Sequence, residues 1–364
     1  ANNVANAASA AFHVRHGESD HIKLSANIST PQAAGTEFNL SSLKAVDIYG
    51  NIADGGNGAT AYAGAKTIAY SLSGTANGLD SGVDSFTTAV TFTAGASTTA
   101  LATTLYRKQN TSITADASDL AGTDVAGNTI TVNAAAANKL KYSVNPPASV
   151  VSGATWTSFD VSIYDTYGNL RGSGTDTIAI SEDGAVGVFS GTASKAAVNG
   201  TAIFNDISYN VAESINVTAS SATVTNPAGA FAVSVTAGSV SYLKVTAGAA
   251  SMTAGGTLEL TITAYDTNNN VATGYTGNKS LTFSGLANAP DGTVPTVEAV
   301  NQGTPVTVAF TSGASDANAA TLIAYKAEAV AVSVDVTDGT NNSTGATTYD
   351  LDLTVNVGAA SKLK

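Results

Sequence analysis

The chain of 364 residues contains no cysteine, one methionine, one tryptophan and three histidines. The absence of cysteine excludes disulfide scaffolds, thiol catalysis and cysteine-ligated zinc. All three histidines lie within the first 21 residues, so a serine nucleophile elsewhere in the chain has no histidine base beside it in the sequence. These shortages argue against an enzyme and imply no organic cofactor.

Charge is also scarce, because charged residues make up 12% of the chain and the net charge is −12. Binding a polyanion requires clustered cations, so we expect no nucleic-acid partner. No apolar stretch reaches the roughly 18 residues that a membrane-spanning helix needs, so we expect no membrane insertion. Low charge, one methionine, no cysteine and many Thr, Ser, Asn and Gly residues suit a secreted protein at the cell surface, which is the location we expect.

What the sequence does contain is a threefold repeat, marked by three features that keep the same order. A short segment with a lysine comes first, an aspartate follows 24, 24 and 22 residues later, and a phenylalanine lies in an alternating run beyond it. The markers are Lys23, Lys141 and Lys244, then Asp47, Asp165 and Asp266, then Phe92, Phe204 and Phe310. They predict an extended segment over 1–19, domains over 20–137, 138–239 and 240–360, and over 361–364 the start of a further strand or a tail.

Within each copy the apolar residues alternate with polar ones, which is the pattern of a half-buried strand. Leu258, Leu260, Ile262 and Ala264 alternate in this way, and so do the valines from 330 to 336 and the apolar residues from 351 to 357. About seven such runs per copy, separated by Gly and Asn turns, fit a β-sandwich. The expected fold class is therefore all-β, with three tandem β-sandwich domains.

Three segments carry a resemblance to a known family. They are LKAVDIYGN (43–51), SFDVSIYDTYGN (158–169) and YLKVTA followed by TAGGTLELTITAYDTNNNVATGYTG (242–247 and 253–277). They resemble the bacterial immunoglobulin-like repeats of large secreted surface proteins, which are related in pattern to invasin-type and filamin-type domains. The resemblance runs from about residue 20 to the end and implies immunoglobulin-like domains of adhesins, surface layers, fibres or enzyme appendages. The third copy departs from it, with Asn268-Asn269-Asn270 in place of Tyr-Gly-Asn.

The recurring aspartates have two interpretations. Carboxylate and amide oxygens suit calcium, so Asp47, Asp165 and Asp266 are candidate calcium ligands. In the second copy further ligands are available from Asp176, Glu182, Asp183 and Asp206. The alternative is that Asp and Asn form turns through their own side chains, with Gly or Asn in the left-handed conformation.

The only histidine cluster runs from residue 13 to residue 21, and zinc binding by His13, His16 and His21 is a minor hypothesis. The tetrapeptide from Arg15 to Glu18 matches the short motif of histidine phosphatases, but the all-β pattern opposes that family. The alternative is a polar connection between a leader segment and the first domain. Trp156 is expected in the core or at an edge of the second copy.

The two ends of the chain bear on assembly. Phe12 and Val14 alternate with Ala11, His13 and Arg15 before the first repeat. Ser361–Lys364, with Leu363, repeats the opening strand of a domain. Either end can pair with a sheet edge of a neighbouring subunit. A frayed tail and a cut through a longer array are the alternatives.

The sequence predicts a non-enzymatic extracellular structural protein that forms a homopolymer, as a subunit of a surface fibre, sheath or surface layer, joined by terminal strand exchange. The alternative is an adhesin stalk or ligand-binding module, whose loops meet a carbohydrate or host ligand.

Overall fold

The computed structural model describes residues 13–25, 29–122, 129–344 and 348–359. Strands account for the regular structure of this part of the chain, together with one 3-10 turn, η1 (Gly56–Gly58). The described residues include no helix with the length and apolar character needed to cross a membrane. The protein is all-β, as the sequence predicts.

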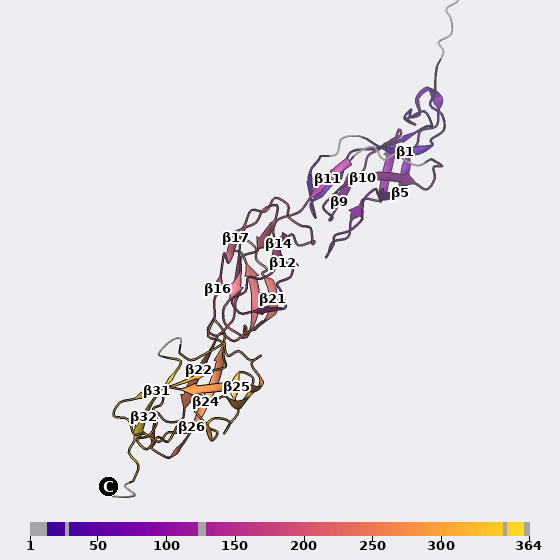
Figure 1. Cartoon of the computed structure of the whole chain (residues 1–364). Coiled ribbons are helices and arrows are strands. Elements are labelled where there is room, and N and C mark those ends of the chain that lie inside the picture. The colour runs from indigo at the N-terminus through magenta and orange to yellow at the C-terminus, as the bar shows by residue number, and fades with distance from the viewer. Residues whose placement is uncertain (1–12, 26–28, 123–128, 345–347, 360–364) are drawn as a thin grey trace, which may run out of the picture.

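Buried apolar side chains gather into three separate cores that follow one another along the chain. The parts that enclose them lie end to end (Figure 1). We call them the N-terminal module (His21–Asn133), the middle module (Lys139–Thr236) and the C-terminal module (Tyr242–Asn356). The residue bounds predicted from the sequence for three domains stay a prediction.

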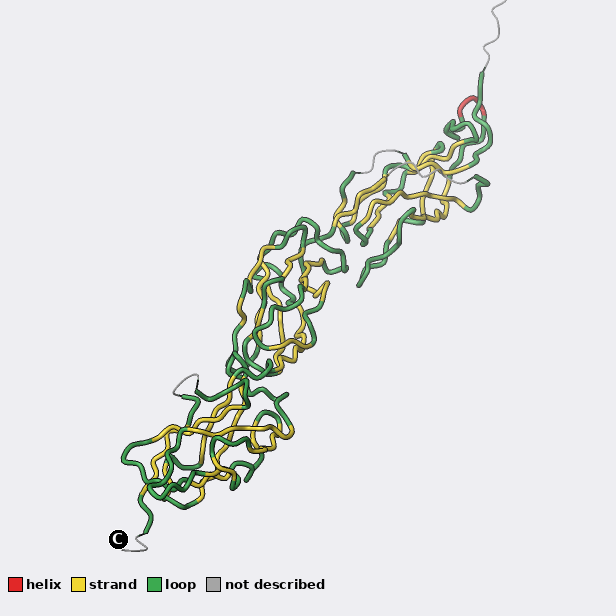
Figure 2. The backbone as a smooth tube through the Cα atoms, viewed as in Figure 1, coloured by secondary structure: helices red, strands yellow, loops and turns green. Residues whose placement is uncertain are grey.

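The strands are short and are linked by loops throughout (Figure 2). The N-terminal module contains β1 (His21–Leu24), β2 (Gln32–Ala33), β3 (Glu37–Leu40), β4 (Leu43–Val46), β5 (Gly64–Leu72), β6 (Ser85–Phe86), β7 (Ala89–Thr93), β8 (Ala96–Ser97), β9 (Leu101–Thr104), β10 (Gln109–Ala117) and β11 (Thr129–Asn133). The middle module contains β12 (Lys139–Val144), β13 (Ser149–Val151), β14 (Phe159–Tyr164), β15 (Thr177–Glu182), β16 (Phe189–Ser190), β17 (Ser194–Ala196), β18 (Thr201–Phe204), β19 (Ser208–Tyr209), β20 (Ser214–Ser220) and β21 (Ala228–Thr236). The C-terminal module contains β22 (Tyr242–Ala247), β23 (Ser251–Thr253), β24 (Thr257–Tyr265), β25 (Gly277–Ser284), β26 (Thr296–Val297), β27 (Val300–Asn301), β28 (Val306–Thr311), β29 (Ala314–Ser315), β30 (Thr321–Ile323), β31 (Val332–Thr337) and β32 (Leu351–Asn356).

The modules share one strand-pairing plan, which is that of an immunoglobulin-like sandwich. The first strand of each module pairs antiparallel with the strand that ends at the recurring aspartate: β1 with β4, β12 with β14 and β22 with β24. The second strand pairs in parallel with the last strand: β2 with β11, β13 with β21 and β23 with β32. The chain therefore enters each module beside the aspartate and leaves it beside the second strand.

The period-two pattern produces the cores. In β24 the side chains of Leu260, Ile262 and Ala264 are buried, whereas Thr261 points to solvent. The three marker phenylalanines are buried, and Trp156 lies in the middle core against Phe159 and Phe189. Two expected strand positions are wrong: Val330 and Val357 lie outside β31 and β32 and are exposed, because the chain leaves the sheet there.

Candidate functional site: the junctions between modules

Asp47, Asp165 and Asp266 form the same turn in each module. One carboxylate oxygen, Oδ1, accepts the backbone N–H of the residues two and four positions later, at 2.8–2.9 Å. The residue three positions later has a positive φ: Gly50, Gly168 and Asn269. Glycine and asparagine tolerate this conformation best, which explains why Asn269 can replace the glycine of the first two copies.

The second carboxylate oxygen holds the chain that enters the module. Oδ2 accepts the backbone N–H of Gly17, Ala135 and Gly238 at 2.8, 2.9 and 2.9 Å in the three modules. Because the first strand starts opposite the end of the strand before the aspartate, the incoming segment must pass this oxygen. The aspartate therefore fixes the direction in which each module is approached.

Hydrogen bonding lowers the pKa of two of these carboxylates, Asp47 and Asp266. The side-chain amide of Asn51 and the N–H of Gly17 lower the pKa of Asp47 well below its usual range. Burial alone would raise the pKa of Asp266, but hydrogen bonds from Ser152, Gly238 and Asn270 outweigh it and lower the pKa to about 2. The turns of Asp47 and Asp266 therefore carry a negative charge at the entrance of their modules.

The asparagine that ends the turn contacts the preceding module. At the first junction Asn169 Nδ2 donates to the carbonyl of Tyr106 at 2.8 Å, and Asn169 Oδ1 accepts the N–H of Lys108 at 2.7 Å. At the second junction Asn270 bonds the carbonyl of Asn210 at 2.9 Å and the N–H of Ala212 at 2.8 Å. Both junctions thus use one amide to pair with a carbonyl and an N–H two residues apart.

The residue in the middle of the turn packs on a glycine of the preceding module. Tyr167 lies against Gly35, where an added Cβ would overlap the phenol ring, and its ring meets Tyr106 edge-on at 4.8 Å between centroids. At the second junction Asn268 lies against Gly153 in the same way. Only a residue without a Cβ allows so close an approach.

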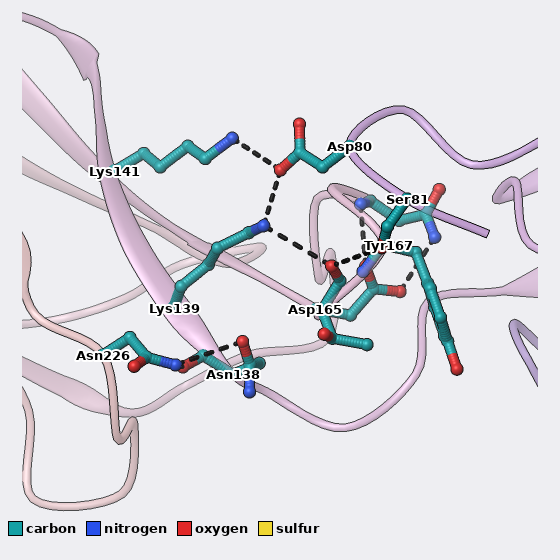
Figure 3. A network of polar contacts seen from close by, with 10 residues as sticks. Asp80, Ser81, Asn138, Lys139, Lys141, Asp165, Tyr167 and Asn226 are labelled. Carbon is teal, nitrogen blue, oxygen red and sulfur yellow. Dashed lines mark hydrogen bonds and ion pairs between the residues drawn. The ribbon is translucent and has the colours of Figure 1, made fainter.

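The first junction has an additional set of ionic contacts (Figure 3). Asp80, in a loop of the N-terminal module, pairs with Lys139 at 2.5 Å and with Lys141 at 2.7 Å, both on β12. The backbone N–H of Asp80 also donates to the carbonyl of Tyr167 at 2.9 Å. The hydrogen bond from Lys139 is the largest contribution that lowers the pKa of Asp80.

The second junction has hydroxyl and amide donors where the first has lysines. Ser152 of the middle module donates its hydroxyl to Asp266 at 2.6 Å, and Asn268 Nδ2 donates to the carbonyl of Ser152 at 3.1 Å. Ser152 and Asp266 are both buried. The second junction therefore closes on a hydrogen-bond network and the first on exposed ion pairs.

The calcium prediction for the three aspartates stays a prediction. Their oxygens accept hydrogen bonds from N–H and O–H groups, which stabilises a carboxylate without a cation. Within the residues that the structure describes, no three His, Asp or Glu side chains are grouped so that they could hold a metal. The four further candidates have separate partners: Asp176 with Arg171 and Thr223, Glu182 with the N–H of Gly184, Asp183 with Asn216, and Asp206 with Thr192 and Lys195.

The predicted assembly residues fall at the two ends. Phe12 and Leu363 lie outside the described residues. Val14 is 73% exposed, and its carbonyl accepts the side-chain amide of Asn57 at 3.0 Å. The nearby histidines bond within the module, His16 to the N–H of Gly55 and His21 to Asp20.

Sequence reasoning missed the partners of the turns. Asn169 and Asn270 appear in the repeat, but Tyr106 and Asn210 lie in loops whose sequences differ between copies. One feature of the sequence could have indicated where the turns make contact: a glycine follows the second strand of each module. These glycines are Gly35, Gly153 and Gly255, and all have a positive φ.

No protein-family model and no curated protein matches the sequence. Among solved structures, the chain is similar to the Escherichia coli adhesin FdeC, with 20% identity over 94% of this chain and 99% of that one, and a TM-score of 0.39. It is similar to Yersinia pseudotuberculosis InvD, with 13% identity over 86% and 92% of the chains and a TM-score of 0.37. Domains 4–9 of the surface layer protein SbsC give 15% identity over 94% and 48%, with a TM-score of 0.23.

Proposed function

We propose that the chain is a non-enzymatic structural protein of the extracellular surface, which assembles end to end into a fibre, sheath or surface layer. The observation that carries this proposal is the repetition of one set of contacts at two junctions. An aspartate holds the linker, an asparagine bonds the preceding loop and a turn residue packs on a glycine. A unit that repeats its own joint is suited to continue beyond its ends.

Stiffness supports the same role. Modules in one chain move relative to each other by default unless their interface restrains them. Here the restraint comes from both sides of the linker, since Asp165 and Asp266 hold the incoming chain while Asn169 and Asn270 hold the preceding module. With few charges on the surface, neighbouring rods repel one another weakly.

Terminal strand exchange is the finer part of the proposal. The C-terminal sequence GAASKLK (358–364) matches GESDHIK (17–23) at the first glycine, at the apolar residue in the sixth position and at the last lysine. Strand β1 lies at the edge of its sheet and pairs only with β4 among the described strands. The tail of one copy takes the place of residues 17–23 in the next, with Leu363 at the position of the buried Ile22. Such a head-to-tail contact does not close on itself, so it produces filaments.

The experiment is electron microscopy of the purified full chain, with calcium and with a chelator, beside a variant that lacks residues 358–364. We expect ordered filaments or sheets from the full chain in both solutions and isolated rods from the shortened variant. A synthetic peptide of residues 356–364 should compete for the edge of β4 and shorten the polymers. Isolated rods from the full chain under every condition contradict the proposal, and normal polymers without the tail contradict strand exchange.

A further inference from the structure

The C-terminal module carries, at its end remote from the middle module, the residues that would form one half of a third junction. At the two internal junctions the preceding module contributes a glycine whose N–H donates, at 2.8 Å, to the residue just before the contacting loop: Gly35 to Leu105 and Gly153 to Tyr209. The C-terminal module repeats this bond between Gly255 and Ala324, also at 2.8 Å. The segment Tyr325–Ala327 therefore corresponds to Tyr106–Lys108 and Asn210–Ala212.

The opposite end carries the complementary half. The turn of Asp47 in the N-terminal module has the same hydrogen bonds as the turns at the two junctions. Its Tyr49 corresponds to Tyr167 and Asn268, and its Asn51 to Asn169 and Asn270. The protein thus presents an aspartate turn at one end and a glycine with its loop at the other.

The residue types at these ends match each other. At the first junction a tyrosine of the loop, Tyr106, meets a tyrosine of the turn, Tyr167. At the second junction both positions are asparagine, Asn210 in the loop and Asn268 in the turn. The outer ends carry Tyr325 in the loop and Tyr49 in the turn, which is the combination of the first junction.

The aspartate turn at one outer end and the glycine at the other are open to solvent, and Tyr325 beside the glycine is half-buried. Tyr49 is 81% exposed and Ile48 beside it is 66% exposed, although both are large apolar side chains. A Cβ added at Gly255 would meet no atom within 4 Å, whereas at Gly35 and Gly153 it would overlap the next module. Within the described residues, neither Tyr49 nor Tyr325 packs on another aromatic ring.

We propose that the occupant of each end is a second copy of this chain, with Tyr49 of one copy packed on Gly255 and Tyr325 of the next. Asn51 Nδ2 donates to the carbonyl of Tyr325, and Asn51 Oδ1 accepts the N–H of Ala327. Gly358 of the docking copy takes the place of Gly17 at Asp47, so residues 17–23 of the receiving copy leave their position, as the strand exchange proposed above requires. The inference rests on the proposed function, since it names the contacts of the same end-to-end joint.

The matching residue types favour a second copy over an unrelated partner. An edge-on pair of tyrosine rings attracts beyond the effect of the area that it buries, because the ring edge of one meets the ring face of the other. The amide of Asn51 requires a carbonyl and an N–H two residues apart, and the loop at 325–327 supplies them next to a glycine of positive φ. A partner of another fold would have to reproduce all three features.

The test compares the unmodified chain with Gly255→Ala and Gly339→Ala by sedimentation over a range of concentrations. Both glycines have a positive φ, +79° and +91°, and an added Cβ at either meets no atom within 4 Å, so the cost to folding is similar. Gly339 lies in the turn after β31, between Asp338 and Thr340, and serves as the matched control. We expect Gly255→Ala to raise the concentration needed for assembly by more than about tenfold and Gly339→Ala to leave it unchanged.

A second measurement uses the absence of native cysteine. Tyr49→Cys and Tyr325→Cys variants are mixed and treated with a short bis-maleimide, with each variant alone as the control. We expect a cross-linked pair in the mixture that neither variant gives alone. If the unmodified chain polymerises while Gly255→Ala does so equally and no mixed cross-link forms, this joint is wrong and the proposed function stands. If the unmodified chain never polymerises, both are wrong.

Discussion

The two junctions of this protein share one set of hydrogen bonds, which we call the frame, and they differ in the contacts around this set. In both, the carboxylate of Asp165 or Asp266 holds the linker, and the amide of Asn169 or Asn270 bonds the module before it. Around the frame, the first junction adds ion pairs from Asp80 and a pair of tyrosine rings. The second adds the buried hydroxyl of Ser152.

The shared hydrogen bonds set how the modules are placed at a junction, and the other contacts set how stable the junction is. The frame bonds backbone groups, which every module possesses, so it can be repeated while the loop sequences change. The surrounding side chains then set how firmly each junction is held and under which conditions. The following experiments remove the frame first and the surrounding contacts afterwards.

The largest effect is expected from removing the aspartate of either junction. In Asp165→Ala, the backbone N–H groups of Tyr167, Asn169 and Ala135 lose their acceptor in a buried place. Each unsatisfied group costs about 1–3 kcal/mol, and two of the three are only part-buried, so we expect the lower limit of the sum, about 3 kcal/mol of lost stability in the middle module. Hydrogen exchange resolved by module, together with small-angle scattering, measures the stability and the loosening of the rod.

Asp47→Ala is the control for that prediction. It removes the same turn bonds, but within the described residues no module precedes it, so the arrangement of the three modules should not change. An unchanged scattering curve for Asp165→Ala would contradict the role of the frame.

A smaller effect is expected from adding one methyl group at the contact glycines. Gly35→Ala and Gly153→Ala share a positive φ near +73°, which costs each about 1 kcal/mol. The Cβ at Gly35 meets the rigid ring of Tyr167, whereas at Gly153 it meets the end of Asn268, which can turn away. We therefore expect Gly35→Ala to disturb its junction more, as measured by a change in the scattering-derived length. Equal changes would show that the ring does not discriminate the junctions.

Acid should weaken the second junction over a defined range. The pKa of Asp266 is about 2 in the folded protein and about 3.9 in an unfolded chain, so its contribution is fully present above about pH 4. The contribution of Asp266 to stability is lost as the pH falls from about 4 through 2. Over this range the unfolded chain binds the proton more readily than the folded protein does, which favours unfolding. Module-resolved hydrogen exchange between pH 5 and pH 2 should show this loss, and Asp266→Asn should flatten the dependence. A flat profile in the unmodified chain contradicts it.

The smallest effect is expected from salt. Exposed ion pairs contribute about 0.2–1 kcal/mol and are screened at high ionic strength, so 1 M salt should loosen the first junction slightly and the second not at all. Asp80→Asn should remove that difference. Distances between spin labels placed on either side of each junction, measured with and without 1 M salt, test whether the first junction loosens more than the second.

Much of the fold follows from the sequence because period-two burial and recurring turn residues are local signals. The alternation at 258–264 becomes β24, and Trp156 enters the middle core as expected. The prediction that Val330 and Val357 lie in strands is wrong, because the alternation continues in the sequence beyond the ends of the strands. Periodicity shows which residues can face a core, and only the fold shows where the core ends.

The candidate site was less accessible to sequence reasoning. The turns of Asp47, Asp165 and Asp266 are visible as a repeat, but a carboxylate that holds a linker and one that binds calcium use the same residue types. The partners of Asn169 and Asn270 are backbone groups, which leave no trace in residue identity. Gly35 and Gly153 were the one signal, since a glycine at the same place in each copy indicates a close approach.

The most direct test of the account measures whether both junctions are held in one geometry. Because the chain has no cysteine, spin labels at Val83 and Val198 report the first junction and labels at Val198 and Val330 the second; all three side chains are exposed. The account predicts one narrow distance distribution for each pair, which broadens across the affected junction in Asp165→Ala or Asp266→Ala. Broad distributions in the unmodified chain would contradict it.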